Sequence, residues 1–163
     1  MMKTEKATFA AGCFWGIESA FKQVKGVVKT TVGYTGGNFD KPTYEDVCSN
    51  KTEHAEAVEV VFDPKKVTYD QLLRVFWQIH DPTQFNRQGP DVGSQYRSVI
   101  FYYNSKQKKL AETSLQKEQK KHTKSIATKT AKVSKFWPAE EYHQDYYGKH
   151  KLAGCAINIM KKL

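Results

Sequence analysis

The chain of 163 residues has few cysteines and no long apolar stretch. Its three cysteines, Cys13, Cys48 and Cys155, are too few for a disulfide scaffold, and their odd number favours a reducing compartment with transient thiol chemistry. No stretch approaches the ~20 apolar residues of a membrane span, and residues 1–5 lack the apolar core of a signal peptide. We therefore expect a cytoplasmic protein that does not contact a membrane, folded as a single domain over residues 1–163.

Most of the chain also lacks excess charge, although the net charge is +9. Residues 106–135 hold ten lysines against Glu112 and Glu118, which gives +8 there and leaves 16 basic and 15 acidic residues, or +1, elsewhere. This segment has neither the arginines nor the interleaved aromatic residues of a nucleic-acid surface, so we expect a solvated helix face and no nucleic-acid partner. A basic module that binds RNA or DNA is the alternative, and salt-dependent binding would identify it.

The most informative stretch is Gly12-Cys13-Phe14-Trp15-Gly16. Residues 6–11 have the pattern of a short strand, and the apolar residues that follow repeat at helical spacing, which predicts a helix from about Cys13 to Gly26. Cys13 is therefore expected on a strand-to-helix turn. The free N–H groups and the dipole at a helix start stabilise a thiolate, so the turn should lower the thiol pKa and produce a nucleophile.

The neighbours of Cys13 support this interpretation. The two glycines allow a tight turn and leave room beside the sulfur, while Phe14 and Trp15 place a large apolar surface next to it. A lone cysteine beside aromatic residues is most often inert core. The helix start, the glycines and the partner residues further along favour a reactive sulfur facing an apolar substrate group.

The rest of the pattern predicts an α+β fold. The expected strands are at 28–34, 55–63, 99–103 and 126–133, with the one at 99–103 central in the sheet. The expected helices are at 68–78, from a cap at Ser105 to His122, and, as a short helix, at 140–147. Structureless loops are expected at 35–52 and 83–95, and a flexible tail at 148–163. This order suits a two-layer sandwich with a mixed, mainly antiparallel sheet, helices packed on it and long loops around the site.

Glu56 is the second candidate for chemistry. The alternation of the strand that begins at Ala55 places Glu56 on the same face as Val58, Val60 and Phe62. Burial raises the pKa of a carboxyl group, so Glu56 could remain protonated and donate a proton. The alternative is a strand-end residue that reaches solvent, because a bulge would exchange the two faces.

Blocks in a fixed order along residues 7–147 resemble the signature sequences of the A-type peptide methionine sulfoxide reductases. These blocks are Gly12–Gly16, Thr43–Ser49, His54–Val58, His80–Pro82, Asn86–Ser98 and Phe136–Gln144. Several motifs in one order make chance an inadequate explanation. The resemblance implies a monomeric, thioredoxin-dependent oxidoreductase without a metal or other cofactor, which reduces methionine S-sulfoxide, free or in oxidised proteins, and so repairs proteins after oxidative stress.

The same resemblance implies a role for each site residue. Cys13 would attack the sulfoxide sulfur and Glu56 would protonate the oxygen. The remaining positions would bind substrate, with Phe14 and Trp15 around the methyl group, Tyr44 and Tyr96 on the oxygen and Asp91 lining the pocket. A sulfoxide sulfur is a poor electrophile until its oxygen gains a proton, so this chemistry needs a neutral acid opposite the thiol. For Asp91 the alternative is that it only holds the Tyr96 loop in place.

Attack by Cys13 would leave a sulfenic acid, which a second thiol converts to a disulfide. The resemblance favours Cys155 in the tail as this resolving cysteine, with Cys48 as a packed bystander or alternative resolver. The chain departs from the family at two positions: the usual Gly-Tyr-Cys reads Ala153-Gly154-Cys155, and Glu53 replaces the glycine that commonly precedes the His54 block.

Other arrangements of these residues are weaker. A cysteine peroxidase would also use Cys13 and a resolver, but would need a basic residue near the sulfur. A zinc site from Cys13, Cys48, His54 and Cys155 lacks the short spacing of structural zinc ligands. His80 and His143 are expected to be hydrogen-bonded structural residues, and His143 with Asp145 does not form a credible triad with Cys13 because the reaction needs an acid.

Overall fold

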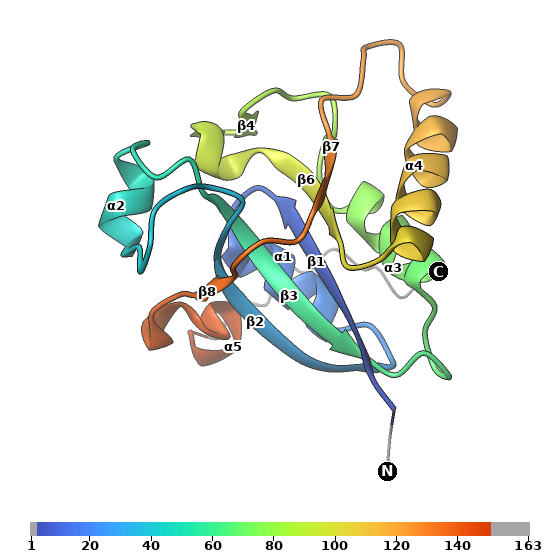
Figure 1. Cartoon of the computed structure of the whole chain (residues 1–163), viewed down its shortest axis with the longest axis horizontal. Coiled ribbons are helices and arrows are strands. Elements are labelled where there is room, and N and C mark those ends of the chain that lie inside the picture. Colours follow the sequence, from blue (N-terminus) through green and yellow to red (C-terminus); the bar gives the residue numbers. More distant parts are fainter. Residues whose placement is uncertain (1–2, 151–163) are drawn as a thin grey trace.

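A six-stranded sheet forms the centre of the computed structural model, which describes residues 3–150 (Figure 1). The strand order is β7-β6-β1-β3-β2-β8. The strand bounds are β1 Glu5–Ala11, β2 Val27–Thr35, β3 Ala55–Phe62, β6 Ser98–Tyr102, β7 Lys129–Lys132 and β8 Trp137–Pro138. All neighbouring strands pair antiparallel except β6 and β7, which pair parallel. The predicted α+β fold with a mixed, mainly antiparallel sheet is therefore confirmed.

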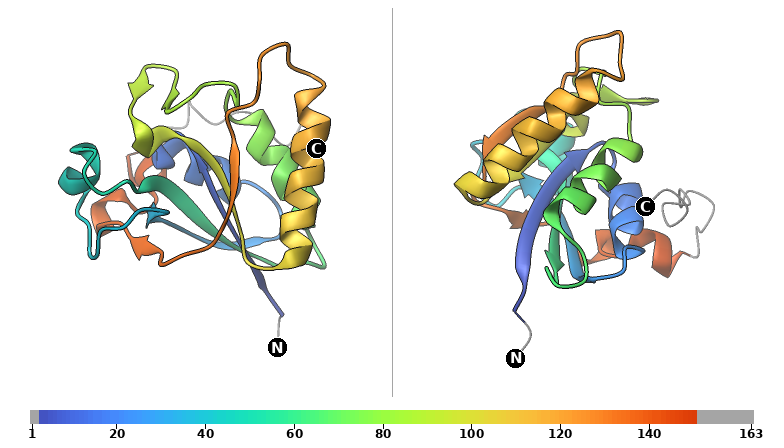
Figure 2. Two further views of the ribbon diagram at one scale, coloured as in Figure 1. Left: turned by 45° about the horizontal axis from the view of Figure 1, so that its top comes forward. Right: turned by 90° about the vertical axis from the view of Figure 1, so that its right-hand side faces the viewer.

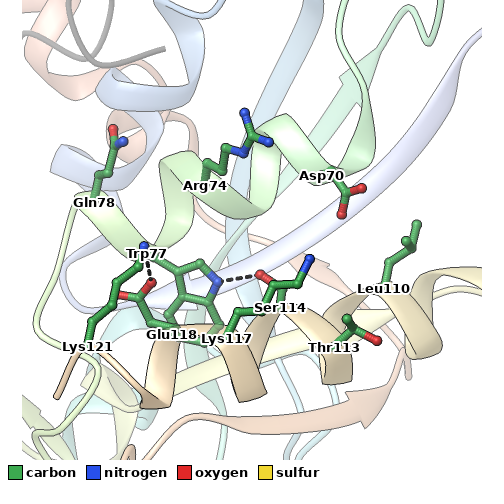
Figure 3. A pocket seen from close by; sticks show the side chains of 10 residues that line it. All are labelled: Asp70, Arg74, Trp77, Gln78, Leu110, Thr113, Ser114, Lys117, Glu118 and Lys121. Atoms are coloured by element: carbon green, nitrogen blue, oxygen red, sulfur yellow. Dashed lines mark hydrogen bonds and ion pairs between the residues drawn. The ribbon is translucent and has the colours of Figure 1, made fainter. Parts of the chain in front are cut away.

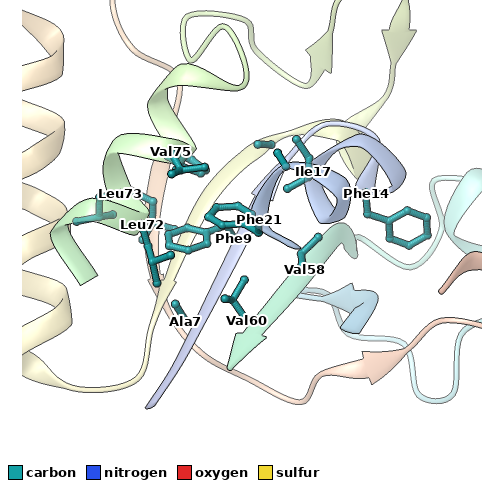
Figure 4. Packing of buried hydrophobic residues seen from close by; sticks show 14 of the residues in the cluster. Ala7, Phe9, Phe14, Ile17, Phe21, Val58, Val60, Leu72, Leu73 and Val75 are labelled. Atoms are coloured by element: carbon teal, nitrogen blue, oxygen red, sulfur yellow. The ribbon is translucent and has the colours of Figure 1, made fainter. Parts of the chain in front are cut away.

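The main core lies between one face of this sheet and the helices α1 (Phe14–Lys22) and α3 (Tyr69–Gln78). Figure 4 shows Phe9 of β1 beside Phe21 of α1, and the two rings stack with centroids 5.0 Å apart. The longest helix, α4 (Ser105–Gln119), adds only Ala111 to the buried core and keeps its lysines outward. Figure 2 shows α4 along one side of the molecule.

The opposite face of the sheet is covered by extended chain. Alternate residues of the same strands form a second buried cluster there, and the segment 131–136 packs against it. The members of this cluster are Ala10, Ala55, Ala57, Val99 and Phe101. Strand alternation therefore assigns Ala55 and Ala57 to this face. It leaves Glu56 on the face of Val58, Val60 and Phe62, as predicted, and this face is the one that packs on the helices.

Helix α1 is shorter than predicted. It ends at Lys22, because the amides of Gln23 and Val24 bond to carbonyls three residues back and tighten the chain into turns. Val24 remains buried, which explains why the apolar spacing continued to that position. The chain then enters β2 through Gly26 at φ 104°, where a Cβ would lie 2.8 Å from Val67.

The loops predicted to be structureless contain short elements. The first includes helix α2 (Tyr44–Cys48), whose N-terminus is stabilised by a capping box between Thr43 and Asp46. The second includes the paired strands β4 (Arg87–Gln88) and β5 (Asp91–Val92) and a 3-10 turn η1 at Ser94–Tyr96. Elements of two to five residues are too short to show an apolar period, so the pattern could not predict them.

Three further details differ from the prediction. The predicted central strand, β6, lies second from the sheet edge and β1 and β3 are central, although β6 is buried on both faces as expected. Asn104, not Ser105, caps α4, because its side chain accepts the amide of Gln107. The predicted helix at 140–147 divides into η2 (Glu141–His143) and α5 (Tyr146–Lys149) around Asp145, which has a left-handed φ of 52°.

Within residues 3–150, no helix is both long and apolar enough to cross a membrane. Most of the predicted tail, including Cys155, lies outside the described residues.

Candidate active site

Cys13 lies at the turn between β1 and α1, as the pattern predicted. It precedes the first helical residue, Phe14, and its side chain is partly exposed. Gly12 has φ 107°, and a Cβ there would lie 3.0 Å from the side chain of Gln88 in β4. A glycine is thus required at this position both for the turn and for the close approach of β4.

Glu56 lies beside the start of the same helix, because β1 and β3 are antiparallel and the end of β1 meets the beginning of β3. The side chain is 1% exposed. Its Oε1 accepts the Phe14 amide at 3.2 Å, while Oε2 is buried and has no hydrogen-bond partner among the described residues. One oxygen is therefore held by the N-terminus of α1, and the other is available to a bound molecule.

Burial raises the pKa of Glu56 to about 8, and the nearby Asp91 carboxylate acts in the same direction. The Phe14 amide opposes the shift without cancelling it. A carboxyl group with this pKa is mostly protonated at neutral pH, so Oε2 can donate a proton.

The expected lowering of the Cys13 pKa is wrong. Burial, followed by the charge of Glu56, raises the pKa of the thiol to about 12. The amides of Trp15 and Gly16 lower it, as a helix start should, but the Asp91 carboxylate adds to the opposite effect. Low dielectric and neighbouring acids outweigh the helix terminus here. The charges that act on Cys13 belong to acids, which does not match the basic surroundings expected of a cysteine peroxidase.

The structure brings Tyr44, Asp91 and Tyr96 to the same place from three separate elements. Burial raises the pKa of Tyr96 to about 12, with added effects from the charges of Glu56 and Asp91. Burial also raises the pKa of Tyr44, with contributions from Cys48 and then Glu56. The charge of Glu56 acts on Tyr44 and Tyr96, and the charge of Asp91 acts on Glu56, which is consistent with α2, β5 and η1 bordering one site.

The two aromatic residues that follow Cys13 differ in burial: Phe14 is buried and Trp15 is partly exposed. Phe14 is 1% exposed, with its ring 5.7 Å from Tyr34 and 5.2 Å from His143. Trp15 is partly exposed and stacks on Tyr146 with centroids 3.8 Å apart and planes 8° apart. The indole N–H donates to Nδ1 of His143 at 2.9 Å.

Sequence reasoning missed Glu140 as a residue of this site. Its carboxylate accepts the Tyr34 hydroxyl at 2.9 Å and the Tyr44 amide at 3.0 Å, so it joins β2 to the first residue of α2. The block 136–144 was recognised as part of the family pattern, but no residue in it received a role in the site. His80 is hydrogen-bonded as predicted, to the carbonyl of Phe76 and the hydroxyl of Ser98.

Cys48 and Glu53, the residue that replaces the glycine common in the family, lie in or next to the loop that contains α2. Cys48 ends α2 and interacts with the Tyr44 hydroxyl, but it is exposed, so the expectation that it is packed is wrong. Glu53 has φ 61°, a left-handed conformation that glycine adopts more readily. Among residues 3–150, no group of three or more His, Cys, Asp or Glu side chains could hold a metal ion.

A separate cavity of about 380 Å³ lies between α3 and α4 (Figure 3). Its lining includes Trp77, whose indole N–H donates to Ser114, and the side chains of Arg74 and Lys117. None of the predicted site residues lines it, so it is distinct from the site at Cys13.

The chain is similar to known proteins over most of its length. The family model described as peptide methionine sulfoxide reductase matches residues 5–163. The chain is 63% identical over 160 residues to the peptide methionine sulfoxide reductase MsrA of Methanosarcina acetivorans, covering 97% of this chain and 85% of the relative. It is 56% identical over 153 residues to the protein of that name from Geobacter metallireducens, covering 93% and 94%.

Two solved structures of Mxr1 from Saccharomyces cerevisiae have the same fold. The reduced form matches with a TM-score of 0.87 and 37% identity, covering 91% of this chain and 87% of Mxr1. The complex of Mxr1 with Trx2 matches with a TM-score of 0.64 and 29% identity, covering 88% and 85%.

Proposed function

This chain belongs to the peptide methionine sulfoxide reductase family, and from that premise we propose that it reduces the S epimer of methionine sulfoxide, free or in proteins, with Cys13 as nucleophile and Glu56 as acid. Reduction of methionine sulfoxide is the shared activity of the family and makes the protein an oxidoreductase. The choice of epimer and the repair of oxidised proteins under oxidative stress rest on the family resemblance.

The observation that carries the mechanism is the position of Glu56. Its Oε1 is tied to the amide that follows Cys13, while its unpartnered Oε2 is buried beside the same turn. A protonated Oε2 suits a sulfoxide oxygen, which is a strong acceptor with no proton of its own. A general acid in this position typically contributes a factor of about 10² to 10⁴ in rate.

The first chemical step begins with both protons in place, because the pKa values of Cys13 and Glu56 are both raised. As the Cys13 sulfur attacks the sulfoxide sulfur, Glu56 gives its proton to the oxygen, and the thiol proton restores the neutral acid. The S–O bond then breaks, and the oxygen leaves as water with the proton of Glu56, while the two sulfurs stay joined. A water molecule attacks the Cys13 sulfur and returns its proton to Glu56, and the bond between the sulfurs breaks to release methionine and Cys13 sulfenic acid. Overall, one thiol and one sulfoxide react to give one sulfenic acid and one methionine. The sulfur of the substrate is reduced and Cys13 is oxidised.

We assign substrate binding to the side chains around this pair. Phe14 and Trp15 supply an apolar wall for the methyl group, and the raised pKa values of Tyr44 and Tyr96 keep both hydroxyls protonated as donors to the oxygen. Asp91 lines the pocket and, by its charge, helps to keep Glu56 neutral.

For the second stage we propose a disulfide between Cys13 and Cys155, formed when the Cys155 thiol displaces water from the sulfenic acid. Tyr146 stacks on Trp15, and Cys155 follows nine residues later. Because Tyr146–Lys149 is helical, only the six steps from Lys149 to Cys155 count towards an extended reach, which is at most about 20 Å. This segment follows a helix whose first residue stacks on Trp15, two positions after Cys13. Cys48 is exposed and interacts with Tyr44, and we assign it no resolving role.

Thioredoxin would then reduce the disulfide, in agreement with the solved complex of Mxr1 with Trx2. We further propose that residues 1–163 form a single catalytic domain that acts as a monomer in the cytoplasm, without a metal or organic cofactor.

The experiment is turnover of each epimer of a blocked methionine sulfoxide, with dithiothreitol and separately with a thioredoxin system. Wild type should reduce the S epimer with either reductant, Cys13→Ser should be inactive, and Cys155→Ser should work with dithiothreitol alone. Cys48→Ser is the matched control and should retain both activities. Turnover of neither epimer by wild type would contradict the proposal, and peroxide would be the next substrate to test.

A further inference from the structure

His143 is a buried histidine that contacts several aromatic side chains of the candidate site. It is 1% exposed and lies on η2, outside the sheet and helices that form the main core. Its ring lies 5.2 Å from Phe14, 5.6 Å from Trp15 and 4.6 Å from Tyr44, measured between centroids. These three neighbours are the aromatic residues assigned to substrate binding on α1 and α2, so His143 lies where the two walls of the pocket meet.

The hydrogen bond from Trp15 defines the state of the imidazole. Because the indole N–H donates to Nδ1 at 2.9 Å, Nδ1 must be unprotonated and the neutral ring carries its proton on Nε2. Nε2 is buried and has no hydrogen-bond partner in the described part of the chain. A buried donor without a partner costs about 1–3 kcal/mol, so burial of this ring is not explained by the stability of its own hydrogen bonds.

The same bond limits the position of Trp15. The indole is partly exposed, and a side chain of this size near the surface would otherwise have several rotamers. Tyr146 covers one face of the ring and His143 holds its N–H edge. The orientation of the indole is therefore determined from two sides.

We propose that His143 is a positioning residue that fixes the Trp15 indole at a set distance from Phe14 and Tyr44, so that the apolar pocket accepts a methyl sulfoxide and rejects larger alkyl groups. This inference rests on the proposed function, because it concerns the pocket for the methyl group. One added methylene in a pocket of fixed width is worth a factor of about 10 to 200 in selectivity. Loss of the hydrogen bond should allow the indole to move and reduce that selectivity.

The test compares kcat/KM for the methyl and ethyl sulfoxides of otherwise identical blocked amino acids. His143→Phe keeps a ring of similar size but removes the acceptor, and His143→Gln restores an acceptor through its amide oxygen. In His143→Phe the preference for methyl should fall about tenfold or more, mainly through a higher KM for the methyl substrate. His143→Gln should recover most of the preference.

His80→Gln is the matched control, since His80 is also a hydrogen-bonded histidine with little solvent exposure but lies between α3 and β6. It should lower thermal stability without changing the methyl to ethyl ratio. If His143→Phe lowers activity on both substrates equally and keeps the ratio of wild type, His143 is only structural and the inference is wrong.

A measurement on wild type decides the inference even if His143→Phe does not fold. In uniformly ¹⁵N-labelled protein, a through-bond coupling between Trp15 Nε1 and His143 Nδ1 reports the hydrogen bond directly, without any turnover. Its presence is expected, and its absence in folded wild type would overturn the inference. A protein that shows this coupling but reduces no sulfoxide would instead contradict the proposed function.

Discussion

The replacement Glu56→Gln should make the protein more stable while removing its activity. Glu56 is 1% exposed, and burial raises its pKa from 4.5 to about 8. The folded state therefore binds a proton that the unfolded state has released between these two pH values. Stability conferred by the protonated group is complete below the unfolded pKa and is lost as the pH rises towards the folded pKa.

The magnitude follows from the two pKa values. Between pH 4.5 and pH 7 the loss amounts to about 3 kcal/mol, at about 1.4 kcal/mol for each pH unit. Glutamine has nearly the same shape, keeps the acceptor for the Phe14 amide and leaves one buried polar atom unpartnered as Oε2 is now. The variant avoids the ionisation penalty, so its free energy of unfolding should exceed that of wild type by about 3 kcal/mol at pH 7.

The assay is urea denaturation of both proteins at several pH values, combined with turnover of methionine sulfoxide. The stability gain of Glu56→Gln should be absent at pH 4.5, grow with pH and level off above pH 8, while turnover falls by a factor of about 10² to 10⁴. The control is Glu59→Gln on the same strand, which replaces a partly exposed residue that pairs with Lys6 at 3.6 Å. It should change stability by less than about 1 kcal/mol. A gain that does not depend on pH, or no gain at pH 8, would refute the reasoning.

Three other predictions concern single positions. Glu53→Gly should raise the free energy of unfolding by about 0.5–1 kcal/mol in urea denaturation, because residue 53 has φ 61° and glycine relieves that strain. A loss of stability would show that the hydrogen bond from Asn38 to the Glu53 carboxylate contributes more than the strain costs. Burial lowers the pKa of His80 to about 4, so the free energy of unfolding should fall by up to about 3 kcal/mol as the pH drops from 6.5 to 4, because only the unfolded state takes up the proton in this range. In urea denaturation at several pH values, His80→Gln should lose this part of the pH dependence. A pH dependence equal to that of wild type would contradict the assignment. Tyr96→Phe should lower kcat for methionine sulfoxide by about 10² to 10³ through loss of a donor to the oxygen, and a change confined to KM would place its hydroxyl in ground-state binding.

Local signals predicted the two residues at the centre of the site. The change from strand to helical spacing placed Cys13 at a turn, and strict alternation placed Glu56 towards the helices. Both inferences depend on neighbours within a few residues, which is why the pattern sufficed. The left-handed backbone of Glu53, where the family commonly has glycine, was not predicted from the pattern.

What the pattern could not provide depends on contacts between distant parts of the chain. The pKa of Cys13 was predicted in the wrong direction, because its burial and the nearness of Glu56 and Asp91 arise only when β1, β3 and β5 come together. The bond between Trp15 and His143 joins residues 128 positions apart. No periodicity in the sequence predicts such a pair. The block around His143 matched the family pattern, but nothing in the sequence indicated a physical reason why a histidine is needed there.

The most direct test of the central claim is the chemical state of each cysteine after one turnover. Reduced protein is mixed with S-methionine sulfoxide in the absence of a reductant, trapped and analysed by peptide mass spectrometry. The account predicts one methionine formed per chain, a Cys13–Cys155 disulfide in wild type, and a single added oxygen on Cys13 in Cys155→Ser. Methionine formed while Cys13 remains an unmodified thiol would contradict the account.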